Sequence, residues 1–201
     1  MMRCIIHIII LSLFFLVSCS NTKSKKECLE YYTKHKQDYM VSKIVSGFEV
    51  KMEYLPKHLF QQDTAQHLKN QDLNFVLTIA PVKDYNDEYK ATMFEKITKF
   101  EEYKDRVYNL NFEMDKLVEM SLDGGSIAYA PVLFNTENTY GLTKEIKINI
   151  VFAPQKSVQE FTVAKELDLV FTDEIFETGI SHFVFDNHKI NNISPSLCSI
   201  D

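Results

Sequence analysis

Hydrophobic and polar residues alternate along several segments of this 201-residue chain, and each such segment predicts a half-buried β-strand. The alternation is plainest in residues 48–54, where Phe48, Val50 and Met52 are separated by charged residues. It returns in residues 108–114, which predict a second strand. Further strands are expected at 73–80, 127–134, 145–153, 167–172 and 182–186, and Asp123-Gly124-Gly125 supplies a turn before 127.

Helical spacing of apolar residues appears in three other segments. It is weak in 27–39, and Pro56 suits the first position of a helix that would run to about residue 69. It is strong in 93–106. Thr92 stands just before this segment and Glu95 lies three positions later, a capping-box pattern typical of a helix start. Many short strands with few helices predict an α+β, mainly β fold: an antiparallel sandwich-like or curved sheet with two helices packed on it.

The first eighteen residues have the layout of a secretory signal. Arg3 gives a short positive region, residues 5–17 are almost entirely apolar, and small residues follow. The apolar run is shorter than the roughly 20 residues that a membrane span needs. We therefore expect residues 1–18 to be removed, together with Cys4, leaving 183 residues, which is enough chain for one globular domain.

The end of that run, Leu16-Val17-Ser18-Cys19, resembles the lipobox of bacterial lipoproteins. The resemblance implies that the Cys19 sulfur takes a diacylglyceryl group, that the chain is cut before Cys19 and that its new amine is acylated. It also implies outer-membrane sorting, since Ser20 stands where Asp signals inner-membrane retention. Membrane attachment through lipid on Cys19, facing the periplasm, is therefore the expected localisation.

Charge is distributed unevenly along the mature chain. Residues 20–26 hold three lysines and no acid, so 19–26 are expected to be a lipidated, flexible basic tether, and 27–201 the folded domain. From Glu27 onward there are 18 lysines and arginines against 28 acids, a net charge of −10. A body of that charge repels nucleic acid, which is therefore not an expected partner.

A second resemblance covers much of the mature chain in short blocks. The chain looks like a group of envelope lipoproteins without an assigned activity, and this resemblance implies no site residue. Its blocks are Tyr54-Leu55-Pro56, Tyr108-Asn109-Leu110-Asn111-Phe112, Phe134-Asn135-Thr136-Glu137-Asn138, Phe171-Thr172-Asp173-Glu174-Ile175-Phe176, Gly179 and Ile193-Ser194-Pro195-Ser196-Leu197.

Motifs for catalysis or cofactor binding are absent from the sequence: there is no nucleophile elbow, zinc helix, C-x-x-C pair, P-loop or dinucleotide turn. We therefore predict no catalytic, cofactor or metal residue. His182, Asp186 and His188 have ligand chemistry, but His182 and Asp186 share a strand face with Val184 while His188 lies past the strand, and surface roles are favoured. Asp84, Asn86 and Glu88 lack the glycine of a calcium loop.

Two covalent modifications remain open. Asp63-Thr64-Ala65 resembles a short sequon for bacterial O-glycosylation, which would place a sugar on Thr64; the alternative is a plain surface threonine. Cys28 and Cys198 remain once Cys4 is removed and Cys19 is lipidated. Export permits a disulfide between them, and the alternative is two free thiols in the end segments.

Two classes of function fit these observations. A non-catalytic role in binding or assembly, with an envelope protein or a glycan as partner, is favoured by the missing motifs. The alternative is an envelope hydrolase acting on glycan or peptide, with an acid pair such as Glu137 and Asp173 meeting across loops.

Overall fold

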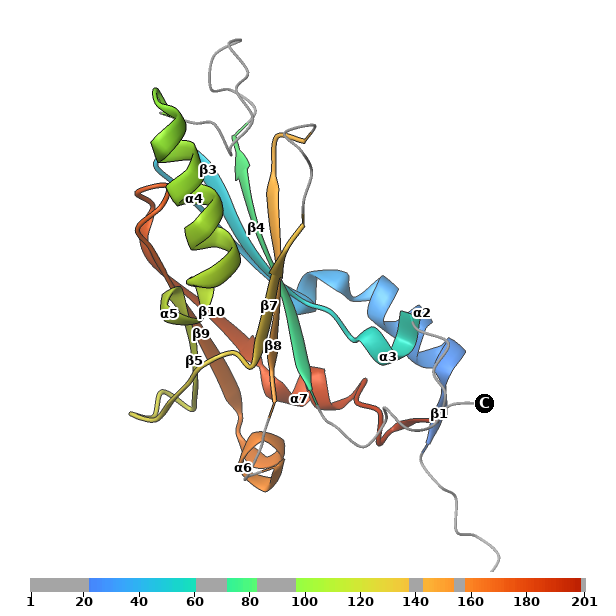
Figure 1. The fold of residues 1–201 in the computed structure, drawn as a ribbon. Coiled ribbons are helices and arrows are strands. Elements are labelled where there is room, and N and C mark those ends of the chain that lie inside the picture. Colours follow the sequence, from blue (N-terminus) through green and yellow to red (C-terminus); the bar gives the residue numbers. More distant parts are fainter. Residues whose placement is uncertain (1–21, 61–71, 83–96, 138–142, 154–157, 200–201) are drawn as a thin grey trace, which may run out of the picture.

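Two antiparallel sheets carry the fold of this protein (Figure 1). The computed structural model describes residues 22–60, 72–82, 97–137, 143–153 and 158–199. The five-stranded sheet has the order β2 (Met40–Val45), β3 (Phe48–Tyr54), β4 (Leu73–Pro81), β8 (Ile146–Phe152), β7 (Leu133–Thr136). The four-stranded sheet has the order β10 (Gly179–Asp186), β9 (Glu166–Asp173), β5 (Val118–Leu122), β6 (Ala128–Tyr129).

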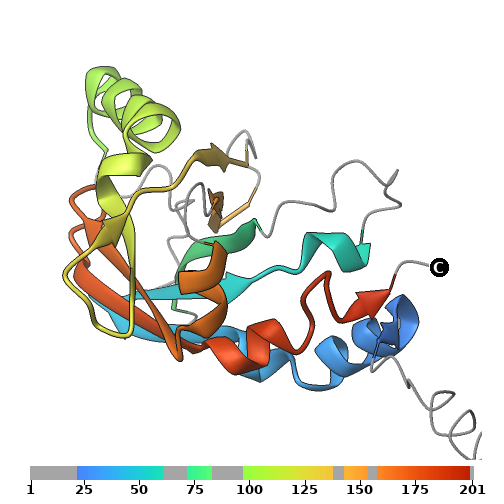
Figure 2. The ribbon, with the colours of Figure 1, turned by 90° about the horizontal axis from the view of Figure 1, so that it is seen from below.

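Helices lie at the ends and along one side of these sheets (Figures 1 and 2). Among the described residues the two longest are α2 (Lys25–Lys34) and α4 (Phe100–Phe112). The predicted class, α+β and mainly β, is confirmed, and of the two arrangements expected, sandwich-like or a curved sheet, the structure has two antiparallel sheets. The shorter helical elements are η2 (Lys36–Tyr39), α3 (Lys57–Phe60), α5 (Met114–Leu117), α6 (Val158–Val163) and α7 (Asn187–Asn191).

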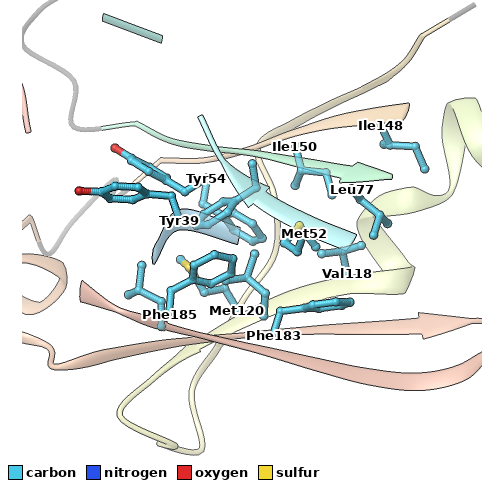
Figure 3. Packing of buried hydrophobic residues seen from close by; sticks show 14 of the residues in the cluster. Tyr39, Met52, Tyr54, Leu77, Val118, Met120, Ile148, Ile150, Phe183 and Phe185 are labelled. Atoms are coloured by element: carbon cyan, nitrogen blue, oxygen red, sulfur yellow. The ribbon is translucent and has the colours of Figure 1, made fainter. Parts of the chain in front are cut away.

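The hydrophobic core fills the space between the two sheets (Figure 3). Alternation places Val50 and Met52 of β3 on the inner face, where both are fully buried, and does the same for Phe183 and Phe185 of β10. The ring of Phe185 lies 5.3 Å from that of Phe75 in β4, so aromatic pairs join the layers. Each such side chain contributes about 1.5–3 kcal/mol on burial, which makes this interface the main source of stability.

The open sides of the two layers are closed in different ways. On one side the edge strands β2 and β10 lie beside each other, and Ser46 Oγ donates a hydrogen bond to the Glu177 carbonyl at 3.5 Å. On the other side α4 and α5 pack between β7 and β5. There Thr136 Oγ1 donates to the carbonyl of Leu110 in α4 at 2.5 Å, so the helix is attached to the edge of the five-stranded sheet.

The strand predicted at 108–114 is wrong, because those residues end α4 and begin α5. Leu110 and Met114 satisfy two patterns at once: alternation with Tyr108 and Phe112, and helical spacing with Tyr103 and Val107. Leu110 and Met114 are fully buried whereas Tyr108 and Phe112 are exposed, which is the distribution of a helix. The predicted helix at 93–106 is correct from Phe100 onward; residues 97–99 are not helical and 93–96 lie outside the described residues.

The strand predicted at 127–134 divides into two strands that belong to different sheets. Ala128–Tyr129 pairs with β5, whereas Leu133–Thr136 pairs with β8. Pro131 lies between them, and proline cannot continue a ladder because it has no amide hydrogen. The preceding turn is formed as expected, with positive φ at Asp123 (52°) and Gly124 (65°).

The N-terminal part of the domain begins earlier than the sequence indicated. Residues 23–26 were assigned to a flexible tether, but Lys23–Ser24 forms β1, which pairs in parallel with β11 (Cys198–Ser199). Ser24 is also the N-cap of α2: its Oγ accepts from the Glu27 amide, and the Glu27 carboxylate accepts from the Ser24 amide. The hydrogen bonds that the Ser24 amide and hydroxyl donate to the Glu27 carboxylate lower the pKa of Glu27. The cap and the strand pairing order these residues despite their charge.

Three tyrosines with buried rings form a cluster between α2, η2 and β3. The ring of Tyr39 lies 5.1 Å from that of Tyr32 and 6.3 Å from that of Tyr54. Burial raises the pKa of all three phenols well above the usual value of 10.0, and the Glu53 carboxylate adds to the effect at Tyr32. The folded protein therefore favours the neutral phenols.

This cluster predicts a loss of stability at alkaline pH. A raised pKa in the folded state stabilises the fold fully below pH 10 and loses that contribution as pH rises beyond it, because only the unfolded chain ionises freely. When the native protein is titrated to alkaline pH, we expect part of the rise in tyrosinate absorbance near 295 nm to come well above pH 10 and to coincide with loss of the circular dichroism signal. Protein denatured in guanidinium should show a single phase near pH 10 instead. A native titration that shows only this early phase would contradict the cluster.

Candidate functional site

Three exposed aromatic side chains on α4 form the largest group of its kind on a single element of the described structure. Phe100, Tyr108 and Phe112 are 71%, 53% and 64% exposed, and we call them the α4 aromatic surface. At 100° per residue the three lie within one third of the helix circumference. The ring of Phe112 contacts that of Tyr108 at 5.2 Å, so the surface is partly preformed.

The start of α4 is fixed by a side-chain cap. The Glu102 carboxylate accepts hydrogen bonds from the backbone amides of Thr98 at 2.8 Å and Lys99 at 3.2 Å. These hydrogen bonds lower the pKa of Glu102, and its negative charge lies favourably at the positive end of the helix dipole. Phe100 therefore projects from an ordered first turn.

A small cavity of about 200 Å³ opens on another side of α4. Glu102 and Arg106 line it from the helix, Phe48 from β3, and Ile175 and Phe176 from the turn between β9 and β10. The Arg106 guanidinium lies 5.0 Å from the centroid of the Phe176 ring. Small-molecule sites are typically about 300–1,000 Å³, so this cavity has room for one side chain rather than for a substrate.

Asp173 holds the turn that forms one wall of this cavity. Its carboxylate accepts hydrogen bonds from the amides of Ile175, Phe176 and Thr178, and from Thr178 Oγ1 at 2.6 Å. The residue is buried, and both carboxylate oxygens are used by the turn. Asp173 therefore has a structural role in the described fold.

Glu137, the other acid considered for a hydrolase, belongs to a different sheet. It follows β7, its amide donates to the Lys147 carbonyl at 2.8 Å, and its carboxylate accepts from the Asn149 side chain at 3.5 Å. Asp173 ends β9 in the four-stranded sheet. The structure assigns each of these acids local partners and gives no support to a shared catalytic site.

Two of the three ligand candidates near the end of β10, His182 and Asp186, also have local partners. His182 Nδ1 lies 3.0 Å from the carboxylate of Asp168 on the neighbouring strand. Asp186 caps α7 by accepting a hydrogen bond from the His188 amide at 2.9 Å. Within the described ranges no group of three or more His, Cys, Asp or Glu side chains could hold a metal ion.

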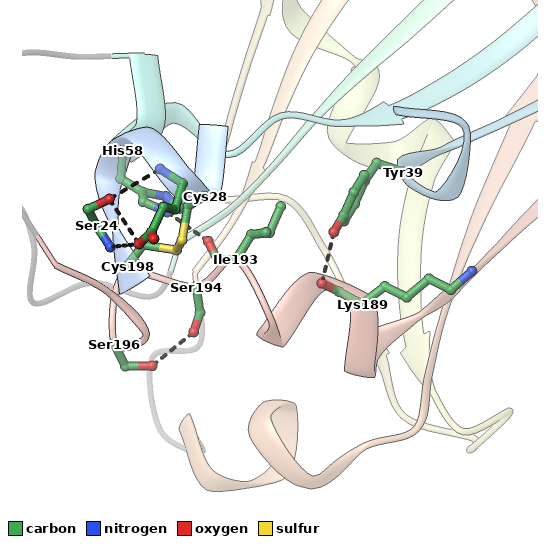
Figure 4. Close-up of a disulfide and its surroundings, with 10 residues drawn as sticks. Ser24, Cys28, Tyr39, His58, Lys189, Ile193, Ser194, Ser196 and Cys198 are labelled. Carbon is green, nitrogen blue, oxygen red and sulfur yellow. Dashed lines mark hydrogen bonds between the residues drawn. A yellow bond between two sulfur atoms is a disulfide. The ribbon is translucent and has the colours of Figure 1, made fainter. Parts of the chain in front are cut away.

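The structure joins Cys28 of α2 to Cys198 of β11 by a disulfide, the pairing that the sequence left open (Figure 4). Their Cα atoms are 6.1 Å apart and 170 positions separate them in the chain. Both side chains are buried. Nearby, His58 Nε2 contacts the Ile193 carbonyl at 2.8 Å, so the segment before β11 is also attached to α3.

The remaining sequence candidates lie outside the described residues. These are Cys19 in the lipobox, Thr64 in the glycosylation sequon, and Asp84, Asn86 and Glu88. The α4 aromatic surface, in contrast, was missed because residues 108–114 were predicted as a strand. The four-residue spacing of Tyr108 and Phe112, eight positions beyond Phe100, was the signal that could have found it.

Comparisons with known proteins leave the function open. No protein-family model matches the chain, and no characterised protein matches it by sequence. One solved structure that it resembles is described as a novel protein of unknown function from Burkholderia pseudomallei K96243. The likeness covers 86% of this chain and 91% of that one, with 7% identity and a TM-score of 0.42, and it assigns neither fold nor function.

Proposed function

We propose that this protein is a lipoprotein of the bacterial envelope, anchored by acyl chains on Cys19, with a non-catalytic role in binding or assembly. The observation that carries the anchor is the sequence Leu16-Val17-Ser18-Cys19 after an apolar run of signal-peptide length. Several acyl chains on one residue bind a membrane far more durably than a single chain does. No helix in the described parts of the chain is long and apolar enough to span a membrane.

The proposed location is the outer membrane, with the domain facing the periplasm. Ser20 after the lipidated cysteine supports this location, because the lipoprotein resemblance ties retention in the inner membrane to Asp at that position. A disulfide between Cys28 and Cys198 is consistent with an exported domain, since disulfides persist in the periplasm and are rare in the cytosol.

The binding role is supported by the α4 aromatic surface. Aromatic side chains are enriched at protein interfaces, and three of them exposed on one helix leave apolar area that a partner would bury. The occupant we propose is an apolar segment of a protein partner. A net charge of −10 from Glu27 onward disfavours nucleic acid, and two of the three rings are phenylalanines, which cannot hydrogen-bond to a sugar.

This role predicts that substitution at α4 removes partner capture without unfolding the domain. The variant is Phe100→Gln with Phe112→Gln. It removes two exposed rings and places glutamine, a good helix former, at both positions. Membranes containing the tagged, lipidated protein would be crosslinked and the captured proteins compared. We expect at least a tenfold loss of the species captured by the wild-type protein, with the thermal melting temperature changed by less than 2 °C, about what a few tenths of a kcal/mol produce.

A matched control comes from the four-stranded sheet. Ile180→Thr with Val184→Thr also removes two exposed apolar side chains, 67% and 48% exposed, from a strand whose other face is buried. It should capture the same species as the wild-type protein. If the α4 variant captured as much as the wild-type protein, the α4 aromatic surface would be excluded as the binding surface. Capture of glycan fragments alone would exclude a protein partner.

A further inference from the structure

The position of the lipid anchor relative to the first ordered strand restricts how the domain can lie on a membrane. Only Ser20, Asn21 and Thr22 separate Cys19 from Lys23, the first residue of β1. Four residue steps span at most about 14 Å when fully extended. Whatever conformation these residues adopt, β1 cannot move further than this from a lipidated Cys19.

The strand at the end of this short connection is held firmly to the rest of the domain. The Lys23 amide donates to the Leu197 carbonyl at 2.8 Å, and β1 pairs with β11. The disulfide then links β11 to α2, which begins immediately after β1. Because strand, disulfide and helix form one unit, the connection cannot lengthen by unwinding β1 without disrupting the paired ends of the domain.

The surface around this point carries basic side chains. Lys23 and Lys26 are exposed and Lys25 is half-buried. The acids of α2 are partly engaged by neighbours: Glu27 accepts hydrogen bonds from Ser24, and Glu30 lies 3.9 Å from Lys26. Lysines held this close to a bilayer are attracted by anionic headgroups.

The α4 aromatic surface lies at the other end of the molecule. Figures 1 and 2 show α4 far from β1 and α2 in two perpendicular views. We infer that the short connection holds the end of the domain formed by β1, α2 and β11 against the headgroups of the bilayer, so that α4 faces away from the membrane. This inference rests on the proposed lipidation and adds an orientation to it.

Energy transfer from a single tryptophan tests this orientation, since the protein has no tryptophan of its own. Glu30→Trp places the donor on α2 and Phe100→Trp places it at the start of α4; both positions are exposed. The full-length lipidated variants would be reconstituted into vesicles of phosphatidylethanolamine and phosphatidylglycerol that contain a dansyl-headgroup lipid as acceptor. We expect at least twofold greater transfer from α2 than from α4.

The matched control is a longer connection. Inserting 20 Gly and Ser residues after Asn21 gives a flexible chain of about 25 Å r.m.s. length, and it should reduce the difference between the two donors. Equal transfer from both donors in the native protein would overturn the inference, and so would a difference that the insertion leaves unchanged. A protein that takes up no lipid would instead refute the proposed function, and mass spectrometry of the reconstituted sample distinguishes that case.

Discussion

Removing the disulfide by Cys28→Ala with Cys198→Ala is expected to lower the free energy of unfolding by about 5 kcal/mol, because the cross-link closes a loop across 170 positions. In the chain-entropy model that constraint acts mainly on the unfolded state. Alanine is the preferred replacement, since both sulfurs are buried and serine would add hydroxyls without partners. Domains of this size are stable by about 5–15 kcal/mol, so the loss would be large.

Urea denaturation of a soluble form that begins at Thr22 measures this effect. The wild-type protein with reducing agent should approach the double variant, while reducing agent should leave the variant itself unchanged. A difference below about 1 kcal/mol would contradict the stabilising role. Alkylation of Cys28 and Cys198 in native wild-type protein purified in air would contradict the bond.

The sequence was most informative where one face of a strand is continuously buried. The segment 48–54 has strict alternation, and β3 occupies those residues with its apolar side chains inside. The same holds for β9 and β10, which extend the predicted segments by a few residues at one or both ends. A shift of one residue in the pairing of these strands would move all their apolar side chains to the exposed face. The alternation therefore predicts these strands well.

Some elements that were not predicted do carry a recognisable signal in the sequence. Strand β2 and its hairpin with β3 were not predicted, although Ser46-Gly47 separates two apolar segments and is a turn pair. Both residues have positive φ, 51° and 83°, as a two-residue hairpin of type I′ requires. Val118, Met120 and Leu122 of β5 also alternate, but the strand assigned at 108–114 hid this pattern.

Other features could not be read from the sequence, because they depend on contacts between distant segments. Ordering of Lys23 and Ser24 requires β11 at the opposite end of the chain. Leu110 and Met114 are helical rather than extended because α4 and α5 pack between the edges of the two sheets, where both side chains are buried. The exposure of Phe100, Tyr108 and Phe112 follows from that choice, so their helical spacing points to the candidate surface only once residues 108–112 are taken as helix.

The second large effect is expected at Cys19. Replacing it with alanine removes the sulfur that accepts the diacylglyceryl group, and the later cleavage depends on that modification under the proposed function. We therefore expect complete loss of lipid and of cleavage at this site. Membrane fractionation would not reveal the change, because an uncleaved apolar segment at 5–17 could itself retain the protein on the membrane.

Metabolic labelling with an alkyne fatty acid, followed by intact mass measurement, tests the lipid anchor most directly. The wild-type protein should take up label and have a mass that begins at Cys19 and includes its acyl groups. The Cys19→Ala protein should take up no label and retain residues 1–18. Label on the Cys19→Ala protein, or an unlabelled wild-type protein, would contradict the account of this chain as a lipid-anchored envelope protein.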